Sequence, residues 1–300
     1  MKESAPERRH GFAIVYKVAV SRFALGVGGG ITAALLKSGR SERLFPPAKG
    51  ERKALIAKPD SLGRFFLVNA GDMGETMDLL EKLKGSESVE LAYVAPPRFV
   101  LATRRQAFVA AGKPPTQNFR DQIRWSAAQA LPQWNCTQPV SIGVLDSGYD
   151  TAHPQLVNGT FQQYLRWPGA RNDALGHGSH VFGQLVAERN AGNTFEGLVP
   201  DCSSATMSCG LADPHDAAGY YRALQSACTA RLVNLSVGGE HEDQLETDIV
   251  RDAIARGSIV VAAMGNDAEL NSPITYPAAI EDVLAVGAVD HAGKRAFFSN

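Results

Sequence analysis

Three short motifs carry chemically active side chains, and each has a glycine beside the active residue. Asp146 opens Asp-Ser-Gly after an apolar run, His177 lies in Gly-His-Gly-Ser-His, and Asn266 follows Gly265 after a second apolar run. A carboxylate, an imidazole and a primary amide can serve as an acid, a base and a hydrogen-bond donor. Because these groups assist a nucleophile that attacks a peptide carbonyl, the motifs indicate acyl-transfer chemistry.

The role of each residue follows from what the attack requires. A serine hydroxyl attacks only if a base removes its proton, and His177 is the candidate base. The imidazolium that forms needs a carboxylate to fix its tautomer and stabilise its charge, which is the role expected for Asp146. The attack also places negative charge on the carbonyl oxygen, and the Asn266 amide can donate a hydrogen bond to that oxygen.

The order and spacing of the motifs match those of one family. His177 follows Asp146 by 31 residues, and Asn266 follows His177 by 89. The chain resembles the subtilisin-like serine proteases (subtilases, peptidase family S8) from about residue 122 to residue 300. The resemblance implies a serine endopeptidase that hydrolyses peptide bonds with an Asp-His-Ser triad and an asparagine in the oxyanion hole.

The nucleophile of that triad is absent from this sequence. The Gly-Thr-Ser-Met-Ala motif of the family should follow His177 by roughly 160 residues, whereas the sequence ends at Asn300. Ser147, Ser179 and Ser236 are not expected to replace it, because they lie beside the acid, on the helix of the base and in the substrate-pairing segment. We therefore expect the 300-residue chain alone to be inactive.

Two hypotheses of different class follow. In the first, the sequence is an incomplete or split form of a peptidase, and a complementing C-terminal segment supplies the serine. In the second, the chain is a catalytically inactive subtilase-like pseudoenzyme that binds a peptide or a protein. Retention of Asp146, His177 and Asn266 favours the first hypothesis.

The resemblance also implies a place for a polypeptide substrate. Residues 236–239 match the Ser-Leu-Gly-Gly stretch of the family, whose backbone pairs with an extended substrate. By the same resemblance, Met264 and Thr275 line the specificity pocket. The implied substrate-binding residues are Ser236, Val237, Gly238, Gly239, Met264 and Thr275.

The elements that must position these residues alternate between strands and helices. Four apolar runs predict buried strands: residues 140–144, 231–235, 258–263 and 282–286. Residues 243–257 predict a helix that ends at Gly257. The alternation predicts an α/β fold with a parallel sheet, and the family resemblance implies the three-layer subtilisin-like domain. Ligands bind at the carboxyl ends of such strands, so Asp146, Ser236 and Asn266 should meet on one rim.

The loop before His177 holds a second acidic residue. Asp173 fits an acidic position that often precedes the Gly-His-Gly turn in this family, and we expect it to form hydrogen bonds within the loop. His177 should begin a helix, with His180 on a helix face. The family's base is the first histidine of this pair.

The first hundred residues predict a small α+β unit. Residues 64–68 and 89–93 read as strands, and a capping box of Asp72 and Glu75 opens a helix that Gly85 closes. Residues 88–96 resemble the end of the inhibitory propeptide that precedes subtilisin-like catalytic domains. The resemblance implies a ferredoxin-like propeptide and a zymogen, with a tail at residues 99–115 along the substrate cleft and a processing point between residues 103 and 117. An unrelated α+β domain is the alternative.

These interpretations predict three regions. Residues 1–103 form the propeptide-like α+β domain, with an irregular N-terminal part. Residues 104–121 are a linker and processing region. Residues 122–300 form the subtilisin-like domain without its C-terminal, serine-bearing part.

Charge and hydropathy limit the other partners. Lysine plus arginine number 30 against 31 acidic residues, so no net field favours nucleic acid. Residues 12–36 are apolar, but Lys17 and Arg22 interrupt them, which argues against a membrane span. Arg8 and Arg9 before this stretch leave export open, so the localisation, cytoplasmic or exported, stays unknown.

Metal and disulfide chemistry have little support. The cysteines lack paired zinc spacing, and we expect small buried residues, with one or two disulfides as the alternative. They are Cys136, Cys202, Cys209 and Cys228. The proposed chemistry needs no cofactor. Structural calcium occurs in many family members, but residues 191–200 contain no carboxylate-rich loop that would establish a site.

Overall fold

The fold is described from a computed structural model, which defines most of the chain. The described residues are 12–18, 30–46, 62–101, 118–131, 140–156, 162–164, 173, 175–188, 195–200, 203–209, 216–290 and 292–300. Contacts divide the chain into two compact units. The first comprises residues 1–97, 213–222 and 243–248, and the second comprises residues 98–212, 223–242 and 249–300.

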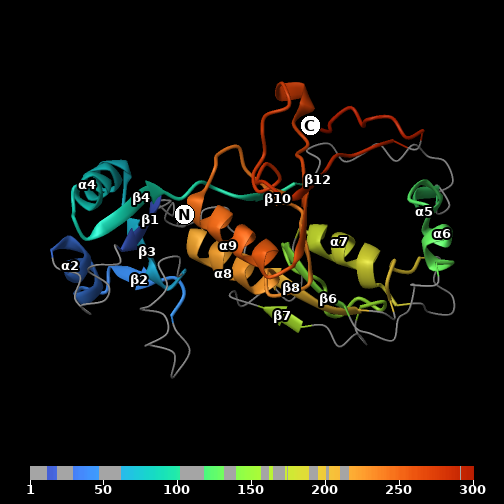
Figure 1. Cartoon of the computed structure of the whole chain (residues 1–300), viewed down its shortest axis with the longest axis horizontal. Helices are drawn as coiled ribbons and strands as arrows, with labels where there is room; N and C mark the ends of the chain where they lie inside the picture. Colours follow the sequence, from blue (N-terminus) through green and yellow to red (C-terminus); the bar gives the residue numbers. More distant parts are fainter. Residues whose placement is uncertain are drawn as a thin grey trace, which may run out of the picture. The chain divides into compact units, whose positions relative to one another are not determined.

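The first unit contains a four-stranded antiparallel sheet in the order β2-β3-β1-β4 (Figure 1). Its elements are β1 (Phe12–Val18), α2 (Ile31–Lys37), β2 (Ser41–Arg43), the 3-10 helix η1 (Leu62–Arg64), β3 (Phe65–Ala70), α4 (Met73–Lys84) and β4 (Val89–Val94). Alternate residues of β1, including Ile14 and Tyr16, share one core with Leu35 of α2 and Leu83 of α4. Both helices therefore cover the same face of the sheet, which gives an α+β unit.

The start of α4 shows the expected capping box. Asp72 accepts a hydrogen bond from the Glu75 amide at 2.8 Å, and Glu75 in turn accepts from the Gly71 amide at 2.6 Å. The first bond satisfies an amide that the first turn of a helix leaves without a partner, and the second differs from a standard capping box in that Glu75 binds the amide of the residue before the cap.

The strand β1 differs from the sequence-based expectation of an irregular N-terminal part. Lys17 interrupts the apolar run in the sequence, yet it lies almost buried in the strand. Its ammonium group is 3.5 Å from Glu90 Oε1 and 3.8 Å from Asp248 Oδ2, so the charge is paired within the first unit. A buried lysine with partners is compatible with a central strand, and the sequence alone does not reveal those partners.

The second unit contains a six-stranded sheet in the order β12-β11-β9-β6-β8-β7, and every neighbouring pair is parallel. Its strands are β6 (Val140–Asp146), β7 (Gln162–Tyr164), β8 (Ser203–Cys209), β9 (Leu232–Leu235), β11 (Ile259–Ala263) and β12 (Leu284–Val286). A short two-stranded sheet pairs β5 (Phe99–Val100) with β10 (Val237–Gly238). The 3-10 helix η3 spans Ala268–Leu270.

Helices lie on both faces of the parallel sheet, among them α7 (His177–Val186) and α8 (Ala217–Ala227). The other helices after residue 101 are α5 (Asn118–Gln122), α6 (Trp125–Gln129) and α9 (Gln244–Ala255). Ile142 of β6 shares a core with Phe182 of α7, whereas a Cβ on the neighbouring Gly143 would lie 2.2 Å from the Ala227 carbonyl oxygen of α8. Successive strand residues point to opposite faces, so α7 and α8 cover different sides. This is the predicted three-layer α/β arrangement, and α8 and α9 run side by side (Figure 1).

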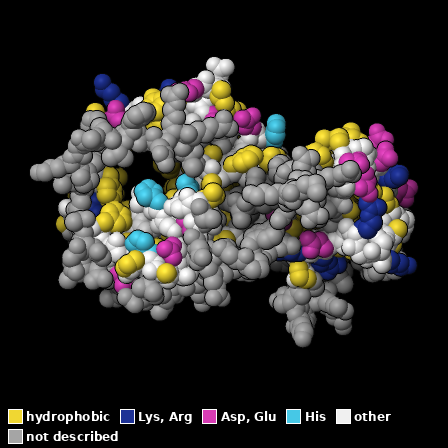
Figure 2. Space-filling model, turned by 180° about the vertical axis from the view of Figure 1, so that it is seen from behind, with side chains coloured by type: hydrophobic (Ala, Val, Ile, Leu, Met, Phe, Trp, Pro, Cys, Tyr) yellow, Lys and Arg dark blue, Asp and Glu magenta, His cyan; other side chains and the backbone are white. Residues whose placement is uncertain are grey.

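Positive, negative and hydrophobic side chains of the described residues lie interspersed on the face shown in Figure 2. Within this described part of the chain, no helix is long and apolar enough to cross a bilayer.

Candidate active site

The predicted functional residues lie at the carboxyl ends of three neighbouring strands. Asp146 is the last residue of β6, Ser236 follows β9, and Asn266 follows β11 after Met264 and Gly265. The strand order β11-β9-β6 and the parallel pairing bring these ends to one edge of the sheet. The sequence-based expectation of a shared rim therefore agrees with the structure.

Asp146 and His177 form a hydrogen-bonded pair. His177 is the first residue of α7, and its Nδ1 lies 2.7 Å from Asp146 Oδ1. The Asp146 side chain is fully buried, and the Ser147 amide also donates to Oδ1 at 2.7 Å. Asp146 Oδ2 is buried without a hydrogen-bond partner among the described residues. A buried carboxylate held to one imidazole nitrogen fixes the tautomer and leaves the other nitrogen for proton transfer.

This environment raises the pKa of His177. The hydrogen bond to Asp146 is the main cause, and the negative charges of Asp146 and Asp173 and the Leu101 carbonyl act in the same direction. Burial of the ring opposes them, because it disfavours the charged form.

A hydrogen-bonded loop fixes the start of α7. Ser147 Oγ donates to Asp173 Oδ1 at 2.7 Å, and the Ser179 amide donates to Asp173 Oδ2 at 2.7 Å. The Gly178 amide donates to Ser147 Oγ at 3.0 Å. The prediction that Asp173 forms hydrogen bonds in the loop is confirmed. These bonds also occupy the Ser147 hydroxyl, which agrees with its exclusion as a nucleophile.

The two glycines that flank His177 meet different backbone requirements. Gly176 has a φ of 70°, in the left-handed region that favours glycine. A Cβ on Gly178 would lie 1.9 Å from the Gly148 carbonyl oxygen, so any side chain there would displace the backbone. The glycine before His177 is therefore explained by its left-handed backbone, and the glycine after His177 by its close contact with Gly148.

The Asn266 amide points at a carbonyl of the chain itself. Its Nδ2 donates to the Leu101 carbonyl oxygen at 2.7 Å, and the Leu101 amide donates to the Ser236 carbonyl oxygen at 3.1 Å. Immediately before Leu101, β5 pairs antiparallel with β10, so Val100 faces Val237 and Phe99 faces Gly238. Residues 98–101 and all these partners belong to the second unit.

Residues 99 and 100 thus pair with part of the segment that was predicted to bind an extended substrate, whereas the role of residues 99–115 as a propeptide tail stays a prediction. Residues 102–115, and with them the predicted processing range of 103–117, lie outside the described part of the chain. Leu101 was not among the predicted site residues, and its place in the predicted tail was the only signal for it in the sequence.

Among the other predicted substrate-binding residues, Gly238 and Thr275 lie beside Leu101. A Cβ built on Gly238 would lie 3.1 Å from Leu101 Cδ1 and 2.5 Å from Thr275 Cγ2, so both side chains border this glycine. Gly239 exchanges backbone hydrogen bonds with Tyr276 at 3.0 and 2.8 Å. Met264 Sδ lies beside Gly287, where it would be 3.5 Å from a Cβ on that glycine.

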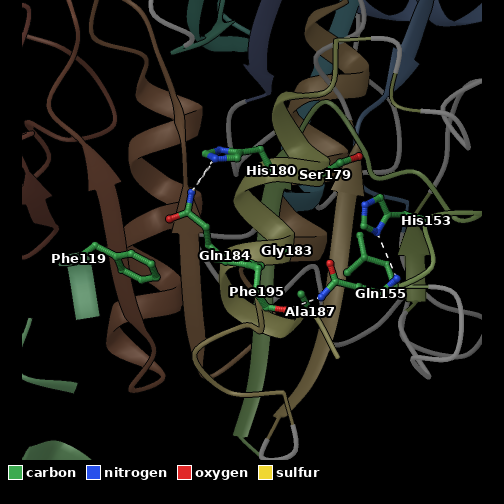
Figure 3. A pocket seen from close by; sticks show the side chains of 10 residues that line it. Phe119, His153, Gln155, Ser179, His180, Gly183, Gln184, Ala187 and Phe195 are labelled. Atoms are coloured by element: carbon green, nitrogen blue, oxygen red, sulfur yellow. Dashed lines mark hydrogen bonds between the residues drawn. The ribbon is translucent and has the colours of Figure 1, made fainter. Parts of the chain in front are cut away.

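A separate hollow of about 540 Å³ lies along another face of α7 (Figure 3). His180 lines it and contacts Gln184 Nε2 through Nδ1 at 3.2 Å, which agrees with the expected helix-face position of this histidine. Phe119 and Phe195 supply apolar walls. None of Asp146, His177 and Asn266 lines this hollow.

The cysteine and metal expectations can be compared only in the described residues. Cys209 and Cys228 are buried, as the preferred interpretation expects for these two. Cys136 and Cys202 lie outside the described residues. Among the residues that the structure describes, no three histidine, cysteine or acidic side chains are grouped so as to hold a metal ion.

A buried Asp-His pair with an amide donor, at the carboxyl edge of a parallel α/β sheet, is an arrangement of the kind that serine hydrolases use. Comparison with known families identifies the family. Residues 137–300 match the sequence profile of Peptidase S8, the subtilase family, and the chain belongs to this family.

Individual relatives agree with this assignment. The chain is 29% identical over 176 residues to the major intracellular serine protease of Bacillus subtilis, with 54% of each chain covered. It is 36% identical over 180 residues to the thermophilic serine proteinase of Bacillus sp. strain AK1, with 56% of this chain and 43% of the relative covered. The chain thus spans about half the length of the curated relatives it matches.

One solved structure is similar in fold over most of the chain. It is the epidermin leader peptide processing serine protease (EpiP) of Staphylococcus aureus, with a TM-score of 0.60 and 17% identity. The match covers 97% of this chain and 72% of that protein, and it supports the fold alone.

Proposed function

We propose that this chain carries the acid, the base and the oxyanion donor of a subtilisin-type serine endopeptidase. The observation that supports this most directly is the Leu101 carbonyl, which accepts a hydrogen bond from Asn266 beside the Asp146–His177 pair. The Leu101 carbonyl thus has the two neighbours that a substrate carbonyl needs, a base and an oxyanion donor. The substrate that we propose is a polypeptide.

In the proposed reaction each residue acts at a stated atom. His177 Nε2 takes the proton of a serine hydroxyl as the hydroxyl oxygen bonds to the carbonyl carbon. Asp146 Oδ1 stabilises the imidazolium through Nδ1–H, and Asn266 Nδ2 donates to the oxyanion. His177 then gives the proton to the leaving amine. Water completes the hydrolysis by the same steps, and no cofactor takes part.

The serine must come from outside these 300 residues, since the sequence contains no Gly-Thr-Ser motif. We propose that a complementing C-terminal segment supplies it. We further propose that residues 1–103 act as a propeptide of a zymogen and residues 104–121 as the processing linker. The α+β sheet of the first unit and the pairing of β5 with β10 support this assignment.

A second candidate function is a pseudoenzyme that binds a peptide or a protein. The antiparallel pairing of β5 with β10 favours it, because a groove that binds an extended strand needs no nucleophile. The hydrogen bond between Asp146 and His177 weighs against it, since binding alone does not require an oriented base.

A fluorophosphonate probe, which acylates an activated serine, separates these functions. The chain would be labelled alone and in a protein extended by the region encoded after codon 300. We expect labelling only when a serine-bearing segment is present. In that protein His177→Ala should slow labelling by at least about 10³-fold, whereas His180→Ala, on the same helix, should leave it nearly unchanged. Equal labelling of both variants would contradict the proposed base.

A further inference from the structure

The side chain of Asn266 belongs to a turn beyond the end of a strand. β11 ends at Ala263 and η3 begins at Ala268, so Asn266 lies between the two elements. An oxyanion donor acts only if its hydrogen points at the developing charge, and a displacement of about 1 Å can cost about 10²-fold in rate. The groups that hold this turn therefore bear on the chemistry proposed for Asn266.

One residue binds the chain on both sides of Asn266. The Asn300 amide donates to the Gly265 carbonyl oxygen at 3.2 Å, and Asn300 Oδ1 accepts from the Asp267 amide at 2.7 Å. A Cβ on Gly265 would lie 2.3 Å from Asn300 Nδ2, so the Asn300 side chain packs directly against this glycine. Asn300 thus contacts the residue before Asn266 and the residue after it.

The Asn300 side chain is itself held in one orientation. Its Nδ2 donates to the Pro273 carbonyl oxygen at 2.9 Å and to the hydroxyl of the buried Thr275 at 3.2 Å. An inverted amide would turn Nδ2 toward the Asp267 N–H and Oδ1 toward the Pro273 carbonyl. Only the observed orientation therefore satisfies these groups.

A neighbouring bond supports the same turn. The Ala268 amide donates to the Phe298 carbonyl oxygen at 3.1 Å. Residues 298–300 and 265–268 all belong to the second unit. Residues 298 and 300 together therefore hold the backbone from residue 265 to residue 268, while Asn266 Nδ2 donates to the Leu101 carbonyl at 2.7 Å.

We propose that Asn300 is a positioning residue for the candidate oxyanion donor, and that it holds Asn266 Nδ2 in the direction from which it can donate to a peptide carbonyl. In this role Asn300 touches no substrate and acts through residues 265 and 267. The catalytic part of the inference rests on the proposed peptidase function. The fixed direction of the Asn266 amide, in contrast, is a property of the 300-residue chain.

The hold on the Asn266 amide is measured without any nucleophile. In the 300-residue chain, the hydrogen bond to the Leu101 carbonyl should slow solvent exchange of the Asn266 side-chain amide protons, which NMR measures. We expect Asn300→Ala to accelerate this exchange by at least about 10-fold, because the turn loses the bond to Asp267 and the packing against Gly265.

Ser258→Ala is the matched control for this exchange measurement. The Ser258 hydroxyl donates to the Ala230 carbonyl at 2.8 Å, beside the opposite end of β11. The substitution therefore also removes a bond from a side chain to the backbone, but at a distance from Asn266. It should change the exchange of the Asn266 amide by less than about 3-fold. Equal acceleration in Ser258→Ala and Asn300→Ala would overturn the positioning role.

Asn300→Asp separates the two ends of the Asn300 side chain and guards against a folding defect in the alanine variant. The carboxylate can still accept from the Asp267 amide, but it cannot donate to Pro273 or Thr275. We expect the Asn266 amide to exchange no more than about 3-fold faster than in the wild type. Unchanged exchange in Asn300→Ala would overturn the proposal. The same would follow if Asn300→Asp lost as much protection as Asn300→Ala while both kept a cooperative thermal transition.

The catalytic part is tested in the protein extended by the region encoded after codon 300, with hydrolysis of a chromogenic peptide. Asn300→Ala should lower kcat by about 10-fold or more and leave KM within about 3-fold, because the oxyanion forms only after substrate binding. In an Asn266→Ala background the same substitution should lower kcat by less than about 3-fold, since Asn300 acts through Asn266. Equal losses in the two backgrounds would overturn this part.

Failure of the peptidase function has a different signature. If the extended wild type neither hydrolysed the peptide nor reacted with a fluorophosphonate, the peptidase function and the catalytic part of the inference would both be wrong. The exchange of the Asn266 amide in the 300-residue chain would still decide whether Asn300 holds that side chain.

Discussion

His177 lies between two groups that both stabilise its protonated form. Asp146 Oδ1 accepts from Nδ1, and the Leu101 carbonyl lies against the ring. This arrangement suits a base that must carry positive charge at the moment of attack and release it afterwards. The pKa of His177 can be measured in the 300-residue chain itself, because the titration of the ring needs no serine.

Titration of the His177 ring by NMR should give a pKa above its ordinary value of 6.5. Asp146→Asn should lower that pKa, since it removes the main cause of the shift. Asp173→Asn should lower it less, because Asp173 acts on the ring through its charge alone. An unchanged titration in Asp146→Asn would show that the Nδ1 contact does not hold the imidazolium.

The same shift makes stability depend on pH. A histidine whose pKa is raised by folding stabilises the native state fully below pH 6.5 and loses that contribution as the pH rises through the folded-state pKa. The difference in unfolding free energy between the wild type and His177→Gln should therefore shrink as the pH rises through that range. Urea titrations at several pH values measure it, with His180→Gln as the control that should show no comparable trend.

At the scale of elements, α7 depends on contact with the turn that follows β6. A Cβ on Gly178 would overlap the Gly148 carbonyl, whereas a Cβ on Gly183 of the same helix meets nothing within 4 Å. Gly178→Ala should therefore destabilise the chain by about 2 to 4 kcal/mol. Gly183→Ala should stabilise it by up to about 1 kcal/mol through helix propensity. Chemical denaturation measures both, and equal effects would contradict the close approach.

Elements with a strong local pattern were predictable from the sequence. The strands at β6, β9 and β11 are continuous apolar runs, and α4 carries its own capping box, so their existence and type follow from local residues. Family spacing likewise gave Asp146, His177 and Asn266. The functional roles of these three stay a proposal.

Other elements depend on partners distant in the sequence. β8 contains three serines and a threonine and lacks an apolar run, yet its backbone pairs with β6 along seven residues. β1 contains a lysine whose charge is paired only in the folded unit. The place of Leu101 depends on Ser236 and Asn266, more than 130 residues away. No local pattern encodes such contacts.

At the scale of the whole molecule, each compact unit is built from separated stretches of chain. Residues 243–248 group with the first unit, where the Tyr93 hydroxyl donates to Asp243 Oδ1 at 2.8 Å and accepts from the Leu245 amide at 3.1 Å. Burial and the negative charge of Asp243 raise the pKa of Tyr93 well above its ordinary value. The hydroxyl therefore stays protonated and able to donate.

Tyr93→Phe should lower the unfolding free energy by about 1.5 to 3 kcal/mol, because it leaves a buried carboxylate short of one donor. Tyr16→Phe is the matched comparison. Its hydroxyl contacts the neutral Ser41 hydroxyl at 2.7 Å, so its loss should cost about 0.5 to 1.5 kcal/mol. Urea denaturation measures the loss of unfolding free energy in both variants. A larger loss in Tyr16→Phe would contradict the greater contribution of the bond between Tyr93 and Asp243.

The edge of the parallel sheet leads to a prediction about association. β12 lies at one end of the strand order, and Leu284, Val286 and nearby Phe297 are between 51% and 67% exposed. An exposed apolar edge strand favours pairing between chains. Sedimentation velocity should show concentration-dependent association of the chain. Leu284→Lys should reduce it, and a monomer at all concentrations would contradict the prediction.

The strand at residues 99–101 has a further consequence for any competition experiment. Because it is tethered to its own groove, it competes at an effective concentration of roughly millimolar, however dilute the protein is. If the tethered strand itself binds the groove with micromolar affinity, a free peptide would show an apparent dissociation constant raised by about 10³-fold. The true affinity of the groove becomes visible only after the tether is cut or the Leu101 side chain is replaced.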